Sequence, residues 1–198
     1  MRVAINIMLK KFYSGNERFK MEPEVHIIEK WFQEVQRCFT MTNIQLKGKK
    51  EVDLLAIEPS LGECYHVESI VSTSFKLRLN ATYTKSGRCH KNGMDYFYKE
   101  KFNHHTVKQF VNGIFNNKDY RQIIVVWDTK EDLRELNEKC KKDMGIEIWS
   151  IKGIINDLCN HRVTVGSRDD ILRTMELVFL EKKWEKELDN MRARENTL

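Results

Sequence analysis

The spacing of apolar residues predicts an amphipathic helix over residues 23–39. Apolar side chains recur every three or four positions: Val25, Ile28, Trp31, Phe32, Val35 and Phe39. This is the period of a helix with one buried face, and the acidic residues in its first turn suit the positive end of the helix dipole. A short strand over 43–47, turned by Gly48, is expected to follow.

Two apolar runs after that turn predict a pair of neighbouring strands. The runs cover residues 52–57 and 65–72, and the intervening "EPSLGE" contains a proline and a glycine that favour a turn. Each run includes one acidic residue, Asp53 in the first and Glu68 in the second. If the strands pair, these two carboxylates can converge at one point.

The second half of the chain alternates helices and strands. A helix over 105–115 precedes the buried run "RQIIVVWD", and a second helix, with a capping box at Thr129 and Asp132, ends at Gly145 before the strand "IEIWSI". This succession implies a parallel βαβ unit at the back of a mixed sheet. Residues 78–103 fit no clear period, and we expect an insertion or an irregular strand pair there.

The length of 198 residues fits one domain with extensions. The expected parts are an N-terminal extension over 1–21, a core over 22–160 and a C-terminal helical extension over 161–198. The last helix, over 168–192, either packs on the core or serves a partner protomer, so a homodimer is an open alternative.

Positive charge is concentrated in the middle of the chain, although the formal net charge is only +5. Residues 73–122 contain ten basic and three acidic residues with aromatic residues interleaved, which suits a polyanion that offers phosphates and base faces. A solvated lysine-rich face over core aromatics is the alternative. The residues expected to contact nucleic acid are Lys76, Arg78, Lys85, Arg88 and Lys91.

The cysteines and the first residues bear on where the protein works. Five cysteines at irregular spacing, without a C-x-x-C pair, indicate reduced thiols rather than disulfides or zinc. The opening "MRVAINIMLKK" has an apolar patch too short for a membrane span or a signal peptide. We therefore expect a cytoplasmic protein with no membrane partner.

The two strand carboxylates are the strongest chemical signal. A carboxylate in an apolar strand costs several kcal/mol unless it is paired or binds a cation, and two carboxylates suit a hard ion such as Mg²⁺. The alternative is that Asp53 ends its strand near solvent or pairs with a lysine. His66 shares the face of Glu68 by strand alternation, as a satisfied strand histidine or as a group that orients water.

A helix with an early glutamate, followed by "EVDLLAI", a turn and "HVES", resembles the PD-(D/E)XK nuclease superfamily, which includes Holliday-junction resolvases and many restriction enzymes. The resemblance spans roughly residues 22–158. It implies a restriction-endonuclease-like α/β fold with an αβββαβ core, in which helices flank a mixed central sheet. In that family two strand acids bind Mg²⁺, which activates water for attack on a phosphodiester.

By this resemblance Asp53 and Glu68 match the two metal ligands, for Mg²⁺ or Mn²⁺. Glu24 matches the helix glutamate better than Glu29, because apolar residues follow it at the expected offsets. The family lysine is absent, since Ile70 stands two residues after Glu68.

Three explanations of the missing lysine remain open. Lys76, Lys50 or Lys49 can supply the amine from a neighbouring position, with Lys76 taken as the catalytic candidate. Alternatively, the metal site works slowly without it, or the fold has lost catalysis. The expected function is a Mg²⁺-dependent nuclease that acts on DNA. The alternative is a catalytically inactive nuclease-fold protein that binds nucleic acid or serves as an interaction scaffold.

Overall fold

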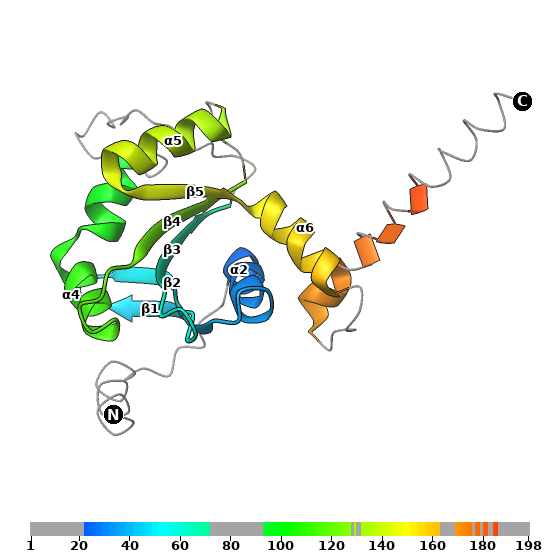
Figure 1. The fold of residues 1–198 in the computed structure, drawn as a ribbon, viewed down its shortest axis with the longest axis horizontal. Helices are drawn as coiled ribbons and strands as arrows, with labels where there is room; N and C mark the ends of the chain where they lie inside the picture. The colour runs from blue at the N-terminus through cyan, green and yellow to red at the C-terminus, as the bar shows by residue number, and fades with distance from the viewer. Residues whose placement is uncertain are drawn as a thin grey trace, which may run out of the picture.

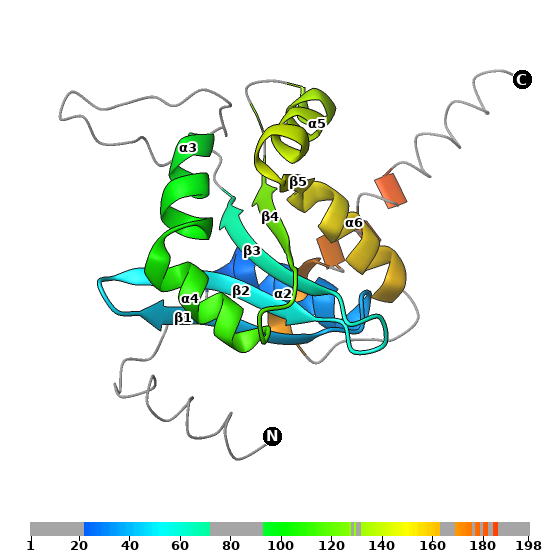
Figure 2. The same ribbon diagram turned by 60° about the vertical axis from the view of Figure 1, so that its left-hand side comes forward.

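The computed structural model describes residues 22–71, 93–127, 129, 132–162, 169–175, 177, 178, 180, 181, 184 and 185. The chain forms an α/β fold in which helices cover both faces of a five-stranded mixed sheet (Figure 1). Helix α2 and helix α6 lie on one face, and α3, α4 and α5 lie on the other (Figure 2).

The elements follow one another in an order that matches the expected αβββαβ core. They are α2 (Pro23–Glu34), β1 (Phe39–Leu46), β2 (Lys50–Ile57), β3 (Cys64–Ile70), α3 (Met94–Tyr96), the π-helix η1 (Phe97–Phe102), α4 (His105–Ile114), β4 (Arg121–Val126), α5 (Leu133–Met144), β5 (Ile146–Ser150) and α6 (Ile151–Arg162). The strands lie side by side in chain order; β1, β2 and β3 pair antiparallel, whereas β4 and β5 continue the sheet in parallel. The predicted fold class is confirmed.

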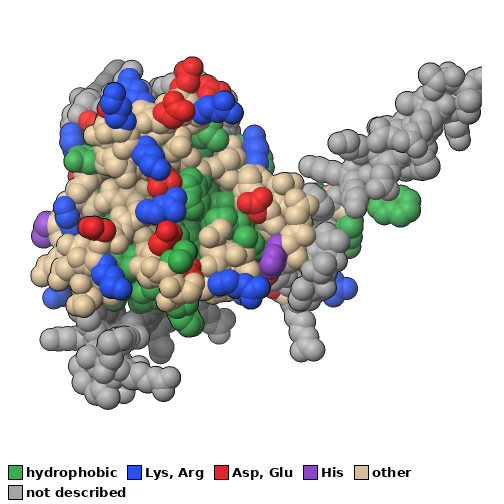
Figure 3. Space-filling model, viewed as in Figure 1, with side chains coloured by type: hydrophobic (Ala, Val, Ile, Leu, Met, Phe, Trp, Pro, Cys, Tyr) green, Lys and Arg blue, Asp and Glu red, His purple; other side chains and the backbone are tan. Residues whose placement is uncertain are grey.

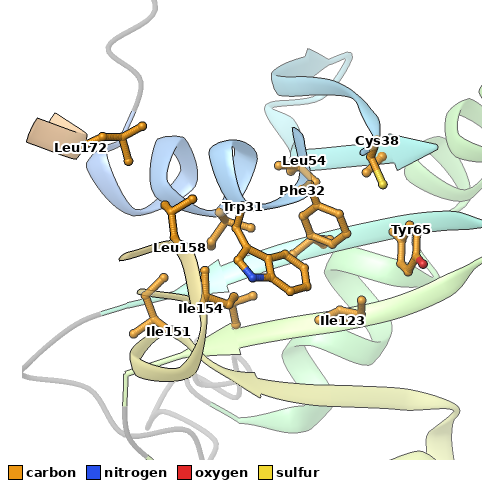
Figure 4. Close-up of a cluster of buried hydrophobic side chains, with 14 residues drawn as sticks. Trp31, Phe32, Cys38, Leu54, Tyr65, Ile123, Ile151, Ile154, Leu158 and Leu172 are labelled. Carbon is orange, nitrogen blue, oxygen red and sulfur yellow. The ribbon is translucent and has the colours of Figure 1, made fainter. Parts of the chain in front are cut away.

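One hydrophobic cluster fixes α2 and α6 against the sheet. Figure 4 shows the Trp31 and Phe32 rings of α2 lying between the strands and Ile154 of α6. Phe32 is fully buried, and its ring is 5.2 Å from that of Tyr65 on β3. Burying large apolar side chains stabilises the fold by about 1.5–3 kcal/mol each, so this face anchors the strands that carry the acidic residues.

The first antiparallel pair bends opposite Asp53. Thr42 pairs with Leu54 and Ile44 pairs with Val52, while Asn43 between them has a φ of 50°. The strand alternation shifts here, because Val52 and Leu55, three positions apart, both pack toward α4. Asp53 therefore sits at a bend rather than within a regular strand.

The helix predicted over 23–39 ends earlier. Helix α2 stops at Glu34, and Arg37 takes a left-handed φ of 59° as the chain turns into β1. Phe39 begins that strand and is 74% exposed instead of sharing the buried helix face. Beyond the helix, Val35 and Cys38 still pack in the same hydrophobic cluster as α2.

Part of the segment expected to be an insertion or irregular strand pair is helical. Residues 94–102 form α3 and the π-helix η1, and Met94, Phe97 and Phe102 pack on the sheet. The last two are five positions apart, which is the repeat of a π-helix and not of an α-helix. A search for the 3.6-residue period therefore missed this element.

The predicted end of α5 at Gly145 is confirmed, but the capping box at Thr129 and Asp132 is wrong, because Asp132 and not Thr129 is the N-cap. Asp132 caps the helix by accepting hydrogen bonds from the backbone amides of Arg134 and Glu135, at 2.9 and 3.2 Å. At the other end Gly145 has a φ of 71°, which a glycine adopts without steric cost. Helix α6, which the apolar pattern did not predict, follows β5 directly.

The described start of the last helix packs on the core. Leu172 joins the cluster around α2, and the Asp169 carboxylate lies 2.7 Å from the His26 ring nitrogen. Farther along, Leu177 and Trp184 are 62% and 63% exposed. Within the described part of the chain, no helix is long and apolar enough to cross a membrane.

The left-handed residue opposite Asp53 gives a stability prediction. Replacing Asn43 by valine should lower the free energy of unfolding by about 1–2 kcal/mol, because a β-branched residue cannot adopt this φ without strain. Asn43→Gly should leave it nearly unchanged, since glycine adopts positive φ freely. Urea denaturation measures both, and equal stabilities for the two variants would contradict the role assigned to the backbone at this position.

Candidate functional site

Asp53 and Glu68 meet across neighbouring strands, as the sequence predicted. The β2–β3 register runs from Ile57 opposite Cys64 to Leu54 opposite Val67, so one further step places Asp53 opposite Glu68. The Asp53 Oδ2 atom accepts a hydrogen bond of 2.8 Å from the Ser69 backbone amide. At the point where the strand pairing ends, the Asp53 carboxylate thus replaces a backbone carbonyl as the acceptor for the Ser69 amide.

A lysine from η1 lies between the two carboxylates. The Lys101 Nζ atom is 2.6 Å from Glu68 Oε2 and 3.4 Å from Asp53 Oδ1, with Glu51 at 3.5 Å. The Glu68 side chain is completely buried and that of Lys101 is only 12% exposed. The buried packing of Phe97 and Phe102 holds η1 on the sheet and directs its lysine to this point.

The electrostatics of the site favour a bound cation. Burial raises the pKa of Asp53 to about 7, and the nearby Glu68 carboxylate adds to this while Lys101 opposes it. Burial likewise raises the pKa of Glu68 to about 7 against the effect of Lys101. Burial alone would lower the pKa of Lys101, but the two carboxylates outweigh burial and raise it. The lysine is therefore charged at neutral pH, and the carboxylates need its charge to ionise.

His66 contacts the second oxygen of Glu68. Its Nε2 atom lies 3.0 Å from Glu68 Oε1, and its ring packs edge-on against Phe102 at 4.8 Å between ring centroids. The side chain is fully buried, and burial lowers its pKa to about 3, so the ring is neutral. The sequence left two alternatives for His66, a satisfied strand histidine or a group that orients water. In the structure its ring forms a direct hydrogen bond with Glu68.

The two helix glutamates singled out in the sequence lie in different surroundings. Glu29 accepts hydrogen bonds from Thr40 and Gln33 at 3.0 and 3.3 Å and belongs to the contact between α2 and β1. Glu24 forms a hydrogen bond with Glu22. Burial and the charges of Glu24 and Glu51 raise the pKa of Glu22, and the charge of Lys101 lowers it. The start of α2 is therefore within electrostatic reach of the site.

Of the lysines named from the sequence, Lys49 and Lys50 do not supply the amine found at the site, and Lys76 lies outside the described residues. Lys50 pairs with Glu100, while Lys49 takes a φ of 58° beside the turn between β1 and β2. Ile70, two residues after Glu68, packs against the hydrophobic cluster that holds η1. Lys101 was missed because nothing in the local pattern of "YKEKF" relates it to Glu68.

The residues predicted to bind nucleic acid cannot be placed. Lys76, Arg78, Lys85, Arg88 and Lys91 lie outside the described residues. On the face shown in Figure 3, basic and acidic side chains are interspersed around a hydrophobic area. That face presents no field of one sign that would by itself indicate a polyanion partner.

The donor set fits a small hard cation. A positive group already lies between two carboxylates, and carboxylate oxygens are the ligands that Mg²⁺ and Mn²⁺ prefer. Among the described residues, no group of three or more His, Cys, Asp or Glu side chains is arranged to hold a metal. The protein would thus provide Asp53 and Glu68, and water or substrate oxygens would complete the coordination, as is common for Mg²⁺.

Comparisons with known proteins add little to this geometry. No family model matches the chain, and no curated protein matches it. A solved structure, the crystal structure of the protein of unknown function AF1548, shows 16% sequence identity and a TM-score of 0.42 over 78% of each chain. The function has to be inferred from the side chains themselves.

The buried ion pairs give a pH-dependent stability prediction. The raised pKa values of Asp53 and Glu68 mean that their contribution to stability is complete below pH 4 and is lost as the pH rises through about 7. In Lys101→Met, measured with EDTA, the free energy of unfolding should fall by about 3–5 kcal/mol at pH 8, because two buried charges lose their partner. The loss should be smaller at pH 5, where both carboxyl groups can hold a proton.

Lys50→Met is the matched control for this change. Its ion pair with Glu100 is partly exposed, so its removal should cost no more than about 1 kcal/mol at either pH. Urea denaturation at pH 5 and pH 8 measures all three proteins. An equal loss for the two lysine variants, or a pH-independent loss for Lys101→Met, would show that the carboxylates do not depend on Lys101.

Proposed function

We propose that this protein is a Mg²⁺-dependent nuclease of the PD-(D/E)XK type that hydrolyses phosphodiester bonds in DNA. The observation that carries the proposal is the convergence of Asp53 and Glu68 on one buried positive group, Lys101, at the end of the β2–β3 pairing. The order of elements from α2 to β4 agrees with the αβββαβ core that the family resemblance implies.

Each residue of the site has a separate task in this proposal. Asp53 and Glu68 would hold a divalent ion, which supplies positive charge at the scissile phosphate and favours ionisation of a nearby water. The Ser69 amide fixes the Asp53 carboxylate, so that ligand is positioned by the backbone of the neighbouring strand. Glu24 and Glu22, at the start of α2, add negative charge at the edge of the site.

Lys101 takes the place of the missing family lysine in this proposal. Asp53 and Glu68 would hold the ion in place of the Lys101 ammonium, which now lies between them. A displaced Lys101 remains charged and close to the site, where it can stabilise the negative charge that develops on the phosphate. The amine that the sequence assigned to Lys76 is thus provided from a helix packed over the sheet.

The proposed partners follow from the sequence. Lys76, Arg78, Lys85, Arg88 and Lys91 would hold the DNA backbone, and a homodimer would bring two sites to one duplex. The described cysteines, Cys38, Cys64, Cys140 and Cys159, are all buried thiols that form no disulfide with one another, which supports a cytoplasmic protein with reduced thiols.

A second candidate function is a nuclease-like fold that binds nucleic acid without cleaving it. The favouring observation is that Lys101 already pairs with both carboxylates, so the site holds a positive group without a metal. In this alternative the three residues form a structural ion-pair cluster. The two candidates differ in whether Mg²⁺ can displace the lysine.

Cleavage of plasmid and branched DNA tests the proposal. Wild type should cut with Mg²⁺ or Mn²⁺ and not with EDTA, Asp53→Asn and Glu68→Gln should be inactive, and Lys101→Met should lose a factor of about 10²–10³ in rate. Lys76→Met is the matched control and should retain kcat, with weaker DNA binding that depends less steeply on salt, because one phosphate contact fewer releases fewer counterions.

Two results would contradict the assignment of roles. A fall in kcat for Lys76→Met with an unchanged Lys101→Met would return the catalytic amine to the residue chosen from the sequence. DNA binding without cleavage in any divalent ion, together with calorimetry that detects no Mg²⁺ or Mn²⁺ binding, would support the inactive alternative.

A further inference from the structure

The two oxygens of Glu68 have different partners. Oε2 lies 2.6 Å from the Lys101 ammonium, and Oε1 lies 3.0 Å from Nε2 of His66. Both Glu68 and His66 are completely buried, so water does not compete for either oxygen. The carboxylate is therefore held at both ends, and only one of its oxygens points to the place where the positive group lies.

The hydrogen bond from His66 has a fixed direction. An ionised carboxylate can only accept a hydrogen bond, so a proton on Nε2 makes His66 the donor to Glu68 Oε1. Nδ1 is buried and has no hydrogen-bond partner among the described residues. A proton on Nδ1 would be a buried donor without an acceptor, which costs more than a bare nitrogen lone pair. Nε2 is thus the donor.

Packing keeps this donor in place. His66 stands two residues before Glu68 on the same strand, and its ring contacts Phe102, the residue next to Lys101. The backbone of β3 is paired on both sides, with Leu55 across from His66 on β2 and Gln122 across from it on β4. Neither the ring nor the strand has room to release Oε1 without disturbing buried contacts.

We propose that His66 is a positioning and specificity-determining residue, which restricts Glu68 to one oxygen and so selects Mg²⁺ or Mn²⁺ over Ca²⁺. The inference rests on the proposed metal site. Mg²⁺ accepts single carboxylate oxygens in a compact octahedron, whereas Ca²⁺ takes six to eight oxygens and often both oxygens of one carboxylate. A Glu68 with Oε1 occupied suits the first ion and not the second.

Calorimetric titration of the full chain with MnCl₂ and with CaCl₂ tests this proposal. His66→Leu removes the donor and frees Oε1. Its Mn²⁺ affinity should fall by about 10-fold or more, as is common for groups that orient metal ligands. Its Ca²⁺ affinity should fall less or rise, so the preference for Mn²⁺ over Ca²⁺ should drop about 10-fold.

Conservative variants separate positioning from packing. The side-chain amide of His66→Gln can reach the position of Nε2 and donate to Oε1, so the ion preference of wild type should be restored to within about threefold. His66→Asn carries the same amide on a shorter chain and should behave like His66→Leu. His105→Leu, at an exposed histidine of α4, is the control for loss of an imidazole and should match wild type.

The outcomes distinguish this inference from the proposed function. Wild type that binds neither ion would overturn both. Wild type that binds Mn²⁺, with His66 variants that lose both ions in parallel or with no recovery in His66→Gln, would overturn only the role of His66. If His66→Leu does not fold, which a thermal melt detects, the comparison of His66→Gln with His66→Asn decides the question alone.

Discussion

The charge of Lys101 between two buried carboxylates is the interaction on which the site depends. A buried carboxylate without a positive partner loses several kcal/mol of hydration, and here two of them face each other across adjacent strands. The pKa values of both carboxyl groups lie near 7 even with the lysine present, so ionised Asp53 and Glu68 require a cation in this place. The remaining features of the site position the carboxylates or the lysine.

The hydrophobic contacts of η1 place Lys101 beside the two carboxylates. Phe97 and Phe102 are buried against β4 and β5, and the π-helical turn between them leaves Lys101 over the ends of β2 and β3. On the other side, the bend at Asn43 and the early end of the β2–β3 pairing free Asp53 to accept from Ser69. Apolar packing thus determines where the charged groups lie. The attraction between Lys101 and the two carboxylates offsets the cost of burying them.

The positive charge that ionised Asp53 and Glu68 require is common to both proposed roles of the site, a metal site and a structural ion-pair cluster. A lysine ammonium and a divalent ion satisfy it in different ways, because the ammonium gives one charge on a flexible chain and the ion gives two with defined geometry. In this structure the ammonium of Lys101 is the positive group, and it favours ionisation of both carboxylates. His66 belongs to this arrangement, since it holds the Glu68 oxygen that the lysine does not contact.

The sequence by itself determined the succession of α2, the five strands, α4 and α5, and the meeting of Asp53 with Glu68. Strand alternation and a turn with proline and glycine are local signals, and they suffice to place two carboxylates on paired strands. The end of α5 at Gly145 was predictable for the same reason, because capping depends on a few adjacent residues, although the N-cap is Asp132 and not Thr129.

Only the tertiary structure decided which lysine serves the site and what surrounds Glu68. Lys101 is far from Glu68 in the chain and reaches it because two phenylalanines five positions apart pack a π-helix onto the sheet. Ile70, only two residues after Glu68, contributes instead to the core that carries η1. Long-range electrostatic pairing depends on how packed elements lie in space, and no local period along the chain records that.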